Sequence, residues 1–178
     1  MAELTPMKRQ YQEIKRQHED CLLFFRLGDF YEMFNEDAKV ASRELDLALT
    51  TRDRNVVDPD ERMPMCGVPY HSAEAYIARL IAKGYKVAIC EQLEDPALAK
   101  GLVQRDVIRI ITPGTVTESS MLEEERSNYL AAVYLDQKSG GVAFCDISTG
   151  EFCCAAFEND APSHVLNELG RFAPREVL

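Results

Sequence analysis

An aromatic ring and a carboxylate stand one residue apart at Phe30 and Glu32, within the stretch FFRLGDFYEMF that spans residues 24–34. In a β-strand, residues i and i+2 project from the same face. The ring of Phe30 and the carboxylate of Glu32 would then project side by side from one face of the strand. A strand that only fills a core needs no such pair.

Two arginines and an apolar tip follow in residues 51–66, which have no helical period and contain two prolines. We predict a long exposed loop there, and long ordered loops are often functional. Arg52 and Arg54 lie near its start, and Met63-Pro64-Met65 forms an unbranched apolar end. Wedges of Phe, Met or Pro flanked by arginine are typical of proteins that kink DNA from the minor groove. Taken alone, each part also fits a purely structural interpretation. Phe30 and Met65 could pack in the core, and the arginines could be exposed to solvent.

Sequence signals for other functions are weaker or absent. No glycine begins a phosphate-binding G-x-x-x-x-G-K-[ST] loop, so this chain does not bind ATP by that route. Asp29 and Glu32 form a carboxylate pair that would suit a metal-dependent nuclease, but no histidine lies nearby in the sequence. Asp146 near Glu151 suggests either an acid cluster or two strand ends with a turn. A protein-interaction module, docking through Phe30 and the methionine loop, is a further alternative.

The cysteine and charge patterns indicate which kinds of site this protein can contain. The six cysteines include no Cys-x-x-Cys pair and the three histidines are scattered, so we expect reduced thiols and no zinc site. Residues 1–115 carry 16 basic and 19 acidic side chains, net −3, whereas residues 116–178 carry 4 and 11, net −7. The first part can therefore still present a local basic face to nucleic acid.

Periodicity predicts the elements that must position these residues. A helix begins after Thr5, with Pro6 at its first position. Strands are expected over 22–27 and 30–34, separated by a turn or bulge at Gly28-Asp29. The next expected elements are a helix capped by Asn35 or Asp37 and running to Leu49, a helix capped by Ser72 and ended by Gly84, and the strands YKVAICEQ and DVIRIITPG.

The acidic stretch 116–127 is predicted to link a first domain, residues 1–115, to a second, residues 128–178. The segments NYLAAVYLD, GVAFCDISTG and EFCCAAF read as three strands, followed by a helix over 163–172 and a strand at REVL. We therefore expect an α/β protein, with a mixed sheet flanked by helices and then a βββαβ unit that is the start of a larger domain. The chain is expected to be a fragment of a longer protein.

Several motifs occur in one order: GDFYEMF, MPMCGVPYH, YKVAICEQLEDP, RDVIRIITPGT, NYLAAVYLD and DISTGEF. Together they resemble the N-terminal region of the MutS family of bacterial DNA mismatch repair proteins, from about Pro6 to the end of the chain. The family's Phe-x-Glu motif falls on Phe30 and Glu32 without departure.

That resemblance implies a mismatch-recognition domain followed by the first part of a connector domain with a ribonuclease H-like fold. It implies that Phe30 inserts from the minor groove beside a mispaired base and that Glu32 hydrogen-bonds a base. From their position and charge we also expect Arg52 and Arg54 to contact the DNA, and from the apolar loop we expect contacts by Pro64 and Met65. The fragment itself is not expected to be an enzyme. The full-length protein is expected to be a cytoplasmic, nucleoid-associated ATPase that uses ATP and Mg²⁺ in a missing domain, forms a homodimer and partners a MutL-type protein.

Overall fold

A computed structural model describes residues 5–51, 62–99, 101–123 and 126–178, which divide into two compact units between Ile111 and Thr112. The first unit contains these helices and strands: α1 (Pro6–Gln17), β1 (Cys21–Leu27), β2 (Phe30–Phe34), α2 (Asn35–Leu45), β3 (Thr50–Thr51), β4 (Pro64–Pro69), the 3₁₀ helix η2 (Tyr70–Ser72), α3 (Ala73–Ala82), β5 (Lys86–Gln92) and β6 (Arg105–Ile111).

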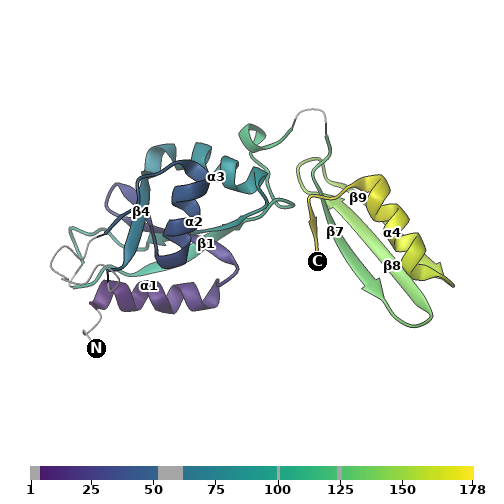
Figure 1. The fold of residues 1–178 in the computed structure, drawn as a ribbon, viewed down its shortest axis with the longest axis horizontal. Coiled ribbons are helices and arrows are strands. Elements are labelled where there is room, and N and C mark those ends of the chain that lie inside the picture. Colours follow the sequence, from purple (N-terminus) through teal and green to yellow (C-terminus); the bar gives the residue numbers. More distant parts are fainter. Residues whose placement is uncertain (1–4, 52–61, 100, 124–125) are drawn as a thin grey trace. The chain divides into compact units, whose positions relative to one another are not determined.

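The first unit is a six-stranded mixed sheet in the order β3-β4-β2-β1-β5-β6, in which β1 and β5 are parallel and the other pairs antiparallel. Helix α1 covers one face, and α2 and α3 cover the other (Figure 1). Tyr11 and Ile14 of α1 pack on Leu23 and Phe25 of β1. This confirms the expected fold class, a mixed sheet flanked by helices.

Cap chemistry explains where the helices begin and end. The Thr5 hydroxyl accepts a hydrogen bond from the Lys8 amide at 3.4 Å, as predicted. Helix α2 is shorter than predicted, because Asp46 takes a left-handed conformation and ends it after Leu45; Leu49 is exposed outside it. Neither Asn35 nor Asp37 caps α2, since Phe34 holds that position.

Asp37 instead turns into the core. Its carboxylate accepts from the Leu23 amide at 3.0 Å and the Tyr11 hydroxyl at 3.3 Å, and it pairs with Lys15 at 3.0 Å. The Ser72 side chain does not cap α3 either. A 3₁₀ turn precedes that helix, and the Ser72 hydroxyl donates to the Pro69 carbonyl at 3.3 Å. The helix ends as predicted, because Gly84 follows it with a positive φ.

The expected loop over residues 51–66 is partly wrong. Thr50 and Thr51 form β3, and β4 starts at Pro64 and pairs with both β3 and β2. The stretch MPMC therefore belongs mostly to a strand, because Met65 and Cys66 supply side chains to the two faces of the sheet. Residues 52–61, which include Arg52 and Arg54, lie outside the described residues.

The second unit has the expected βββαβ order. Its elements are the 3₁₀ helix η3 (Ser119–Met121), β7 (Tyr129–Leu135), β8 (Ser139–Asp146), β9 (Glu151–Glu158), α4 (Ala161–Phe172) and β10 (Glu176–Val177). The sheet runs β10-β7-β8-β9, with β10 parallel to β7, and α4 packs on it through Leu169 and Phe172.

The segment after Ile111 packs with this second unit. The Gly114 amide donates to Glu176 at 3.1 Å, the Asn128 side-chain amide donates to the Pro113 carbonyl at 3.0 Å, and Val116 is buried. The contact boundary therefore falls slightly before the predicted one; the domain and linker limits themselves stay predictions.

Candidate functional site

Phe30 and Glu32 project from the same face of the first sheet, at its β1–β2 hairpin end. The strands pair in the register Leu27↔Phe30 and Phe25↔Glu32. Phe25 lies in the core cluster under α1, so this is the α1 face. Gly28 takes a φ of 57° in the two-residue turn, a conformation that favours glycine. The predicted shared face is thus present in the hairpin.

The two side chains differ sharply in exposure. Phe30 is 46% exposed, whereas Phe24, Phe25 and Phe34 are buried. Glu32 is only 7% exposed. Phe30 is the first residue of β2, directly after the hairpin turn, while Glu32 lies two residues further along the strand, opposite Phe25. Phe30 therefore offers a ring face to solvent in a region where the other aromatics form the core.

Gly67 makes room for Glu32. It lies opposite Glu32 on β4, and its α-carbon position is so close to β2 that an added Cβ would lie 3.1 Å from the Tyr31 carbonyl oxygen and 3.4 Å from Glu32 Cγ. Sequence reasoning missed this residue. A glycine inside a strand is a signal of close approach by a neighbouring group, and that signal was available in MPMCGVPY.

The hairpin is anchored on the opposite face by Arg26. Its Nε donates to the Gly28 carbonyl at 2.5 Å, its guanidinium carbon lies 3.5 Å from the centre of the Tyr70 ring, and its Nη1 pairs with Glu91 at 3.5 Å. The Tyr31 hydroxyl also donates to Glu91. Burial and this bond to Glu91 raise the pKa of Tyr31 to about 12.

A further contact joins the turn to the end of β4, where the Tyr70 amide donates to the Asp29 carbonyl at 3.0 Å. The turn before Phe30 is therefore held from β1, β5 and the 3₁₀ turn after β4. Periodicity alone could not reveal this cluster, because its members come from three separate segments of the sequence.

The remaining predicted site residues are not gathered at one exposed tip. Met65 is 9% exposed and packs in the core cluster with Phe34, so a DNA contact by Met65 would require it to leave the core. Pro64 is half-buried at the start of β4. Met63 packs against the same cluster. The predicted apolar tip is therefore largely core, because the strand pairing of β4 turns Met65 inward.

Carboxylates in the described residues do not form a metal centre. Asp29 is exposed in the turn while Glu32 is buried, and the described part of the chain contains no group of three His, Cys, Asp or Glu side chains suited to a metal ion. Asp146 is 1% exposed and accepts from the Asn128 amide at 2.9 Å and the Ser148 hydroxyl at 2.6 Å. Burial disfavours its charge, but these hydrogen bonds outweigh that effect and lower its pKa. Asp146 therefore organises the turn after β8, which is the strand-end alternative expected from the sequence.

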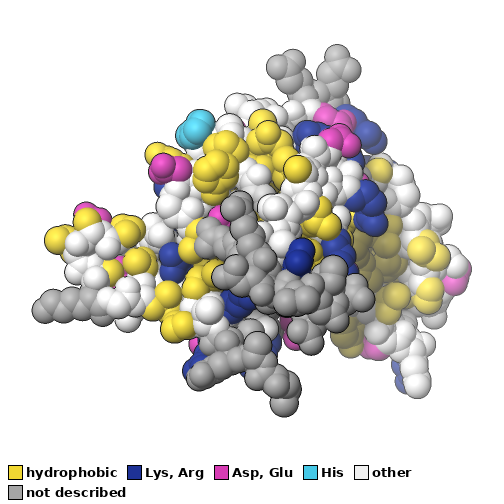
Figure 2. All heavy atoms as spheres, turned by 60° about the vertical axis from the view of Figure 1, so that its left-hand side comes forward, with side chains coloured by type: hydrophobic (Ala, Val, Ile, Leu, Met, Phe, Trp, Pro, Cys, Tyr) yellow, Lys and Arg dark blue, Asp and Glu magenta, His cyan; other side chains and the backbone are white. Residues whose placement is uncertain are grey.

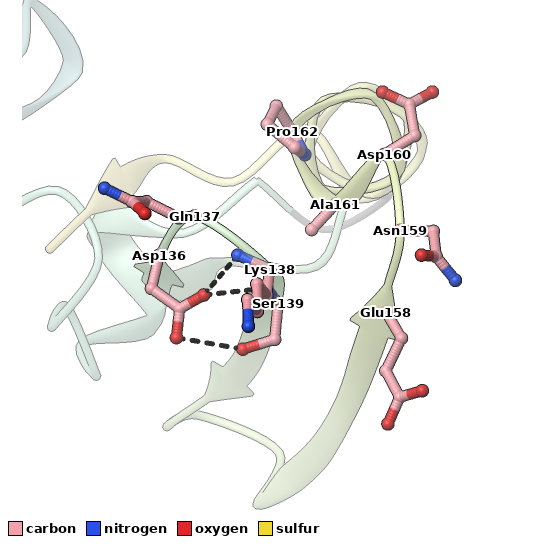
Figure 3. A pocket seen from close by; sticks show the side chains of 9 residues that line it. All are labelled: Asp136, Gln137, Lys138, Ser139, Glu158, Asn159, Asp160, Ala161 and Pro162. Atoms are coloured by element: carbon pink, nitrogen blue, oxygen red, sulfur yellow. Dashed lines mark hydrogen bonds between the residues drawn. The ribbon is translucent and has the colours of Figure 1, made fainter.

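The second unit contains a pocket of about 980 Å³ between the turn after β7 and the start of α4. Asp136 accepts from the Lys138 and Ser139 amides, both at 2.7 Å, and these bonds lower its pKa to about 2. Neither Glu158 nor Asp160 points toward Asp136 (Figure 3). The acidic groups here do not converge on a common point, and the Asp136 carboxylate is already engaged by the amides of its own turn.

Basic and apolar side chains are interspersed on the surface. On the face drawn in Figure 2, lysines and arginines lie among hydrophobic side chains, and acidic side chains are visible as well. None of the helices in the described residues has the length and apolar character needed to cross a membrane.

Comparison with known proteins identifies the family. A family model described as MutS domain I matches residues 5–120, and one described as MutS domain II matches residues 128–178. The DNA mismatch repair protein MutS of Acetivibrio thermocellus is 59% identical over 180 residues, covering 100% of this chain and 20% of that protein. Its counterpart in Clostridium botulinum strain Hall is 58% identical over 175 residues, covering 98% and 18%. The chain spans about a fifth of the length of these curated relatives. It belongs to the MutS family of DNA mismatch repair proteins.

Proposed function

We propose that this chain recognises mismatched or looped duplex DNA by inserting Phe30 from the minor groove beside the mispaired base. One observation carries the proposal: Phe30 is a half-exposed phenylalanine at the tip of a hairpin that is fixed from three segments, while the phenylalanines beside it are buried. A ring held in place at an edge loses little conformational freedom when it enters a base step.

The energetics favour defects over normal pairs. Stacking of an aromatic side chain contributes about 1–3 kcal/mol per base and is indifferent to sequence. Opening a base step costs a few kcal/mol, and the cost is smallest at a mispair. Kinking is also easiest where stacking is already weak. Phe30 would thus report weak stacking rather than base identity.

Glu32 would add discrimination. A carboxylate near phosphates is repelled, so it helps binding only when it accepts a hydrogen bond from a base or carries a proton itself. In normal DNA the base edges that form the pairs are not available to Glu32, so that complex would bear the repulsion without this compensating hydrogen bond. Because Glu32 is buried in the free protein, we propose that side chains around it rearrange when DNA binds, as is common at interfaces.

Flanking contacts are proposed at Pro64, Arg52 and Arg54. Replacing both arginines with alanine should lower the slope of log affinity against log salt by about one to two, with little effect on mismatch preference. For the full-length protein we propose ATPase activity with ATP and Mg²⁺ bound outside this chain, a homodimer, a MutL-type partner and a place near the bacterial nucleoid.

The test is Phe30→Ala in the full-length protein, with competition binding between G·T and G·C duplexes. Loss of about 1–3 kcal/mol of stacking corresponds to about a 5- to 150-fold loss of mismatch preference. Residual binding should survive through phosphate contacts. Phe152→Ala is the matched control, because Phe152 is also an exposed phenylalanine, on β9 of the second unit. An unchanged preference in Phe30→Ala would refute the wedge.

A further inference from the structure

Arg105, at the start of the edge strand β6, is a half-buried cation fixed on the α1 face. Its Nε donates to the Arg26 carbonyl at 2.7 Å, and its Nη1 donates to Gln10 Oε1 at 3.0 Å and to the Val103 carbonyl at 2.9 Å. Its guanidinium carbon lies 5.1 Å from the centre of the Phe25 ring. These contacts hold the guanidinium in one orientation.

The charge of Arg105 has no acidic counterpart in the described part of the chain. Its hydrogen bonds go to two carbonyls and a neutral amide, and no described carboxylate forms an ion pair with it. Burial lowers its pKa. Removing a cation from water is costly unless an anion or hydrogen bonds compensate it. The fold thus maintains a partly desolvated positive charge that a bound anion would stabilise.

Arg105 lies in the same transverse row of the sheet as Phe30. It pairs with Gln92 on β5, and Leu27 pairs with Phe30. Since Phe25 pairs with Cys90, Leu27 and Gln92 occupy the next position on that same face. Three strand spacings of about 4.8 Å therefore separate the backbones at Arg105 and Phe30, about 14 Å in all. Along DNA this distance corresponds to about four base pairs at about 3.4 Å each.

We propose that Arg105 binds a backbone phosphate of the duplex within about five nucleotides of the base step that Phe30 opens. This inference rests on the proposed function and extends it by naming a phosphate contact on the rigid sheet. Other nearby arginines fit less well. Arg26 is already paired with Glu91, and Arg109 lies on the opposite face of β6, opposite Ile89. A guanidinium fixed in advance would set the register of the duplex against the wedge.

The experiment combines a protein variant with chemically neutralised phosphates. Duplexes with one G·T mispair carry a single methylphosphonate at each position up to six nucleotides from the mispair, and binding is measured with full-length protein and Arg105→Gln. A methylphosphonate at one or two positions should weaken binding of the original protein. At those positions the methylphosphonate should not weaken binding of Arg105→Gln, because the variant has already lost the phosphate contact. For Arg105→Gln, the slope of log affinity against log salt should be smaller in magnitude by about 0.9 than for the original protein. The loss of affinity relative to the original protein should therefore be about 3.5-fold larger at 50 mM than at 200 mM salt.

Arg109→Gln is the matched control, because it removes an arginine from the same strand on the opposite face, and it should change neither measurement. If Arg105→Gln responds to every methylphosphonate as the original protein does, or if Arg109→Gln reproduces its effect, the assignment is wrong. Should Arg105→Gln fold poorly, the original protein still decides the matter, because a scan without any sensitive phosphate within five nucleotides would overturn the proposal.

Failure of this proposal can be separated from failure of the wedge. The salt slope on fully matched duplex reports Arg105 without any contribution from mismatch insertion. A retained preference in Phe30→Ala would refute the wedge alone, and an unchanged salt slope in Arg105→Gln would refute the phosphate contact alone.

Discussion

Arg26→Ala should destabilise the protein and loosen the hairpin that carries Phe30. Arg26 joins three groups: the Gly28 carbonyl in the turn, the Tyr70 ring after β4, and the Glu91 carboxylate on β5. The ion pair is partly buried, since the Arg26 and Glu91 side chains are 15% and 24% exposed. Removing Arg26 therefore breaks a connection between strands rather than a surface contact.

The magnitude follows from the interactions that Arg26 makes. A hydrogen bond or ion pair to a charged group at such a site contributes about 1.5–3 kcal/mol, and a guanidinium over an aromatic ring about 0.5–2 kcal/mol. Glu91 keeps the Tyr31 hydroxyl as a donor after the substitution, which limits the loss. We expect the free energy of unfolding to fall by about 2–4 kcal/mol. Arg26→Lys should recover only part of it, because an ammonium group lacks the planar fork that stacks on Tyr70.

Urea unfolding of the 178-residue chain, followed by tyrosine fluorescence, measures the effect, since the chain has seven tyrosines and no tryptophan. Hydrogen exchange at the Phe30 and Tyr70 amides tests whether the loosening is local. Arg79→Ala is the control, because Arg79 pairs with Asp46 at an exposed site and should cost about 0–1 kcal/mol. Mismatch preference in full-length protein should fall in Arg26→Ala and persist in Arg79→Ala.

Two results would contradict this role of Arg26. Equal destabilisation by Arg26→Ala and Arg79→Ala would mean that the cluster contributes no more than a surface ion pair. Unchanged exchange at the Phe30 amide, despite a lower free energy of unfolding, would mean that Arg26 stabilises the sheet without positioning the hairpin.

Three further predictions concern single side chains. Glu32→Gln should tighten binding to matched duplex most, and if the Glu32 carboxyl takes up a proton on mispair binding, the original protein alone should show pH-dependent affinity between about 5 and 8; equal weakening on both duplexes would make Glu32 a scaffold residue. Met65→Ala should lower the free energy of unfolding by about 2–5 kcal/mol with mismatch preference intact, and the reverse pattern in urea unfolding and competition binding would place Met65 on the DNA surface. Asp136, with its pKa lowered to about 2, should stabilise the fold above about pH 4 and lose that effect as pH falls toward 2; urea unfolding of Asp136→Asn at pH 5 to 2 should therefore show less acid sensitivity than the original chain.

Local patterns in the sequence were enough to predict many of the helices and strands of this protein. Apolar spacing and cap residues determined α1, the strands β1, β2, β5 and β6 and the βββαβ order, because these depend on periodicities within about ten residues. The two-residue alternation also placed Phe30 and Glu32 on one face, which any extended strand requires. Ordered motifs along the whole chain indicated the family, which the comparisons confirm.

Only the tertiary structure decided which side chains are exposed and which groups they contact. Nothing in FFRLGDFYEMF distinguishes Phe30 from Phe34; the hairpin tip leaves the first exposed, and α1 covers the second. Met65 looked like a loop residue until pairing with β2 turned it into the core. The Arg26 cluster and the charge of Arg105 depend on strands that are distant in sequence and adjacent in the sheet. Sequence patterns set which way each side chain points along its own strand, but only packing determines what lies opposite it.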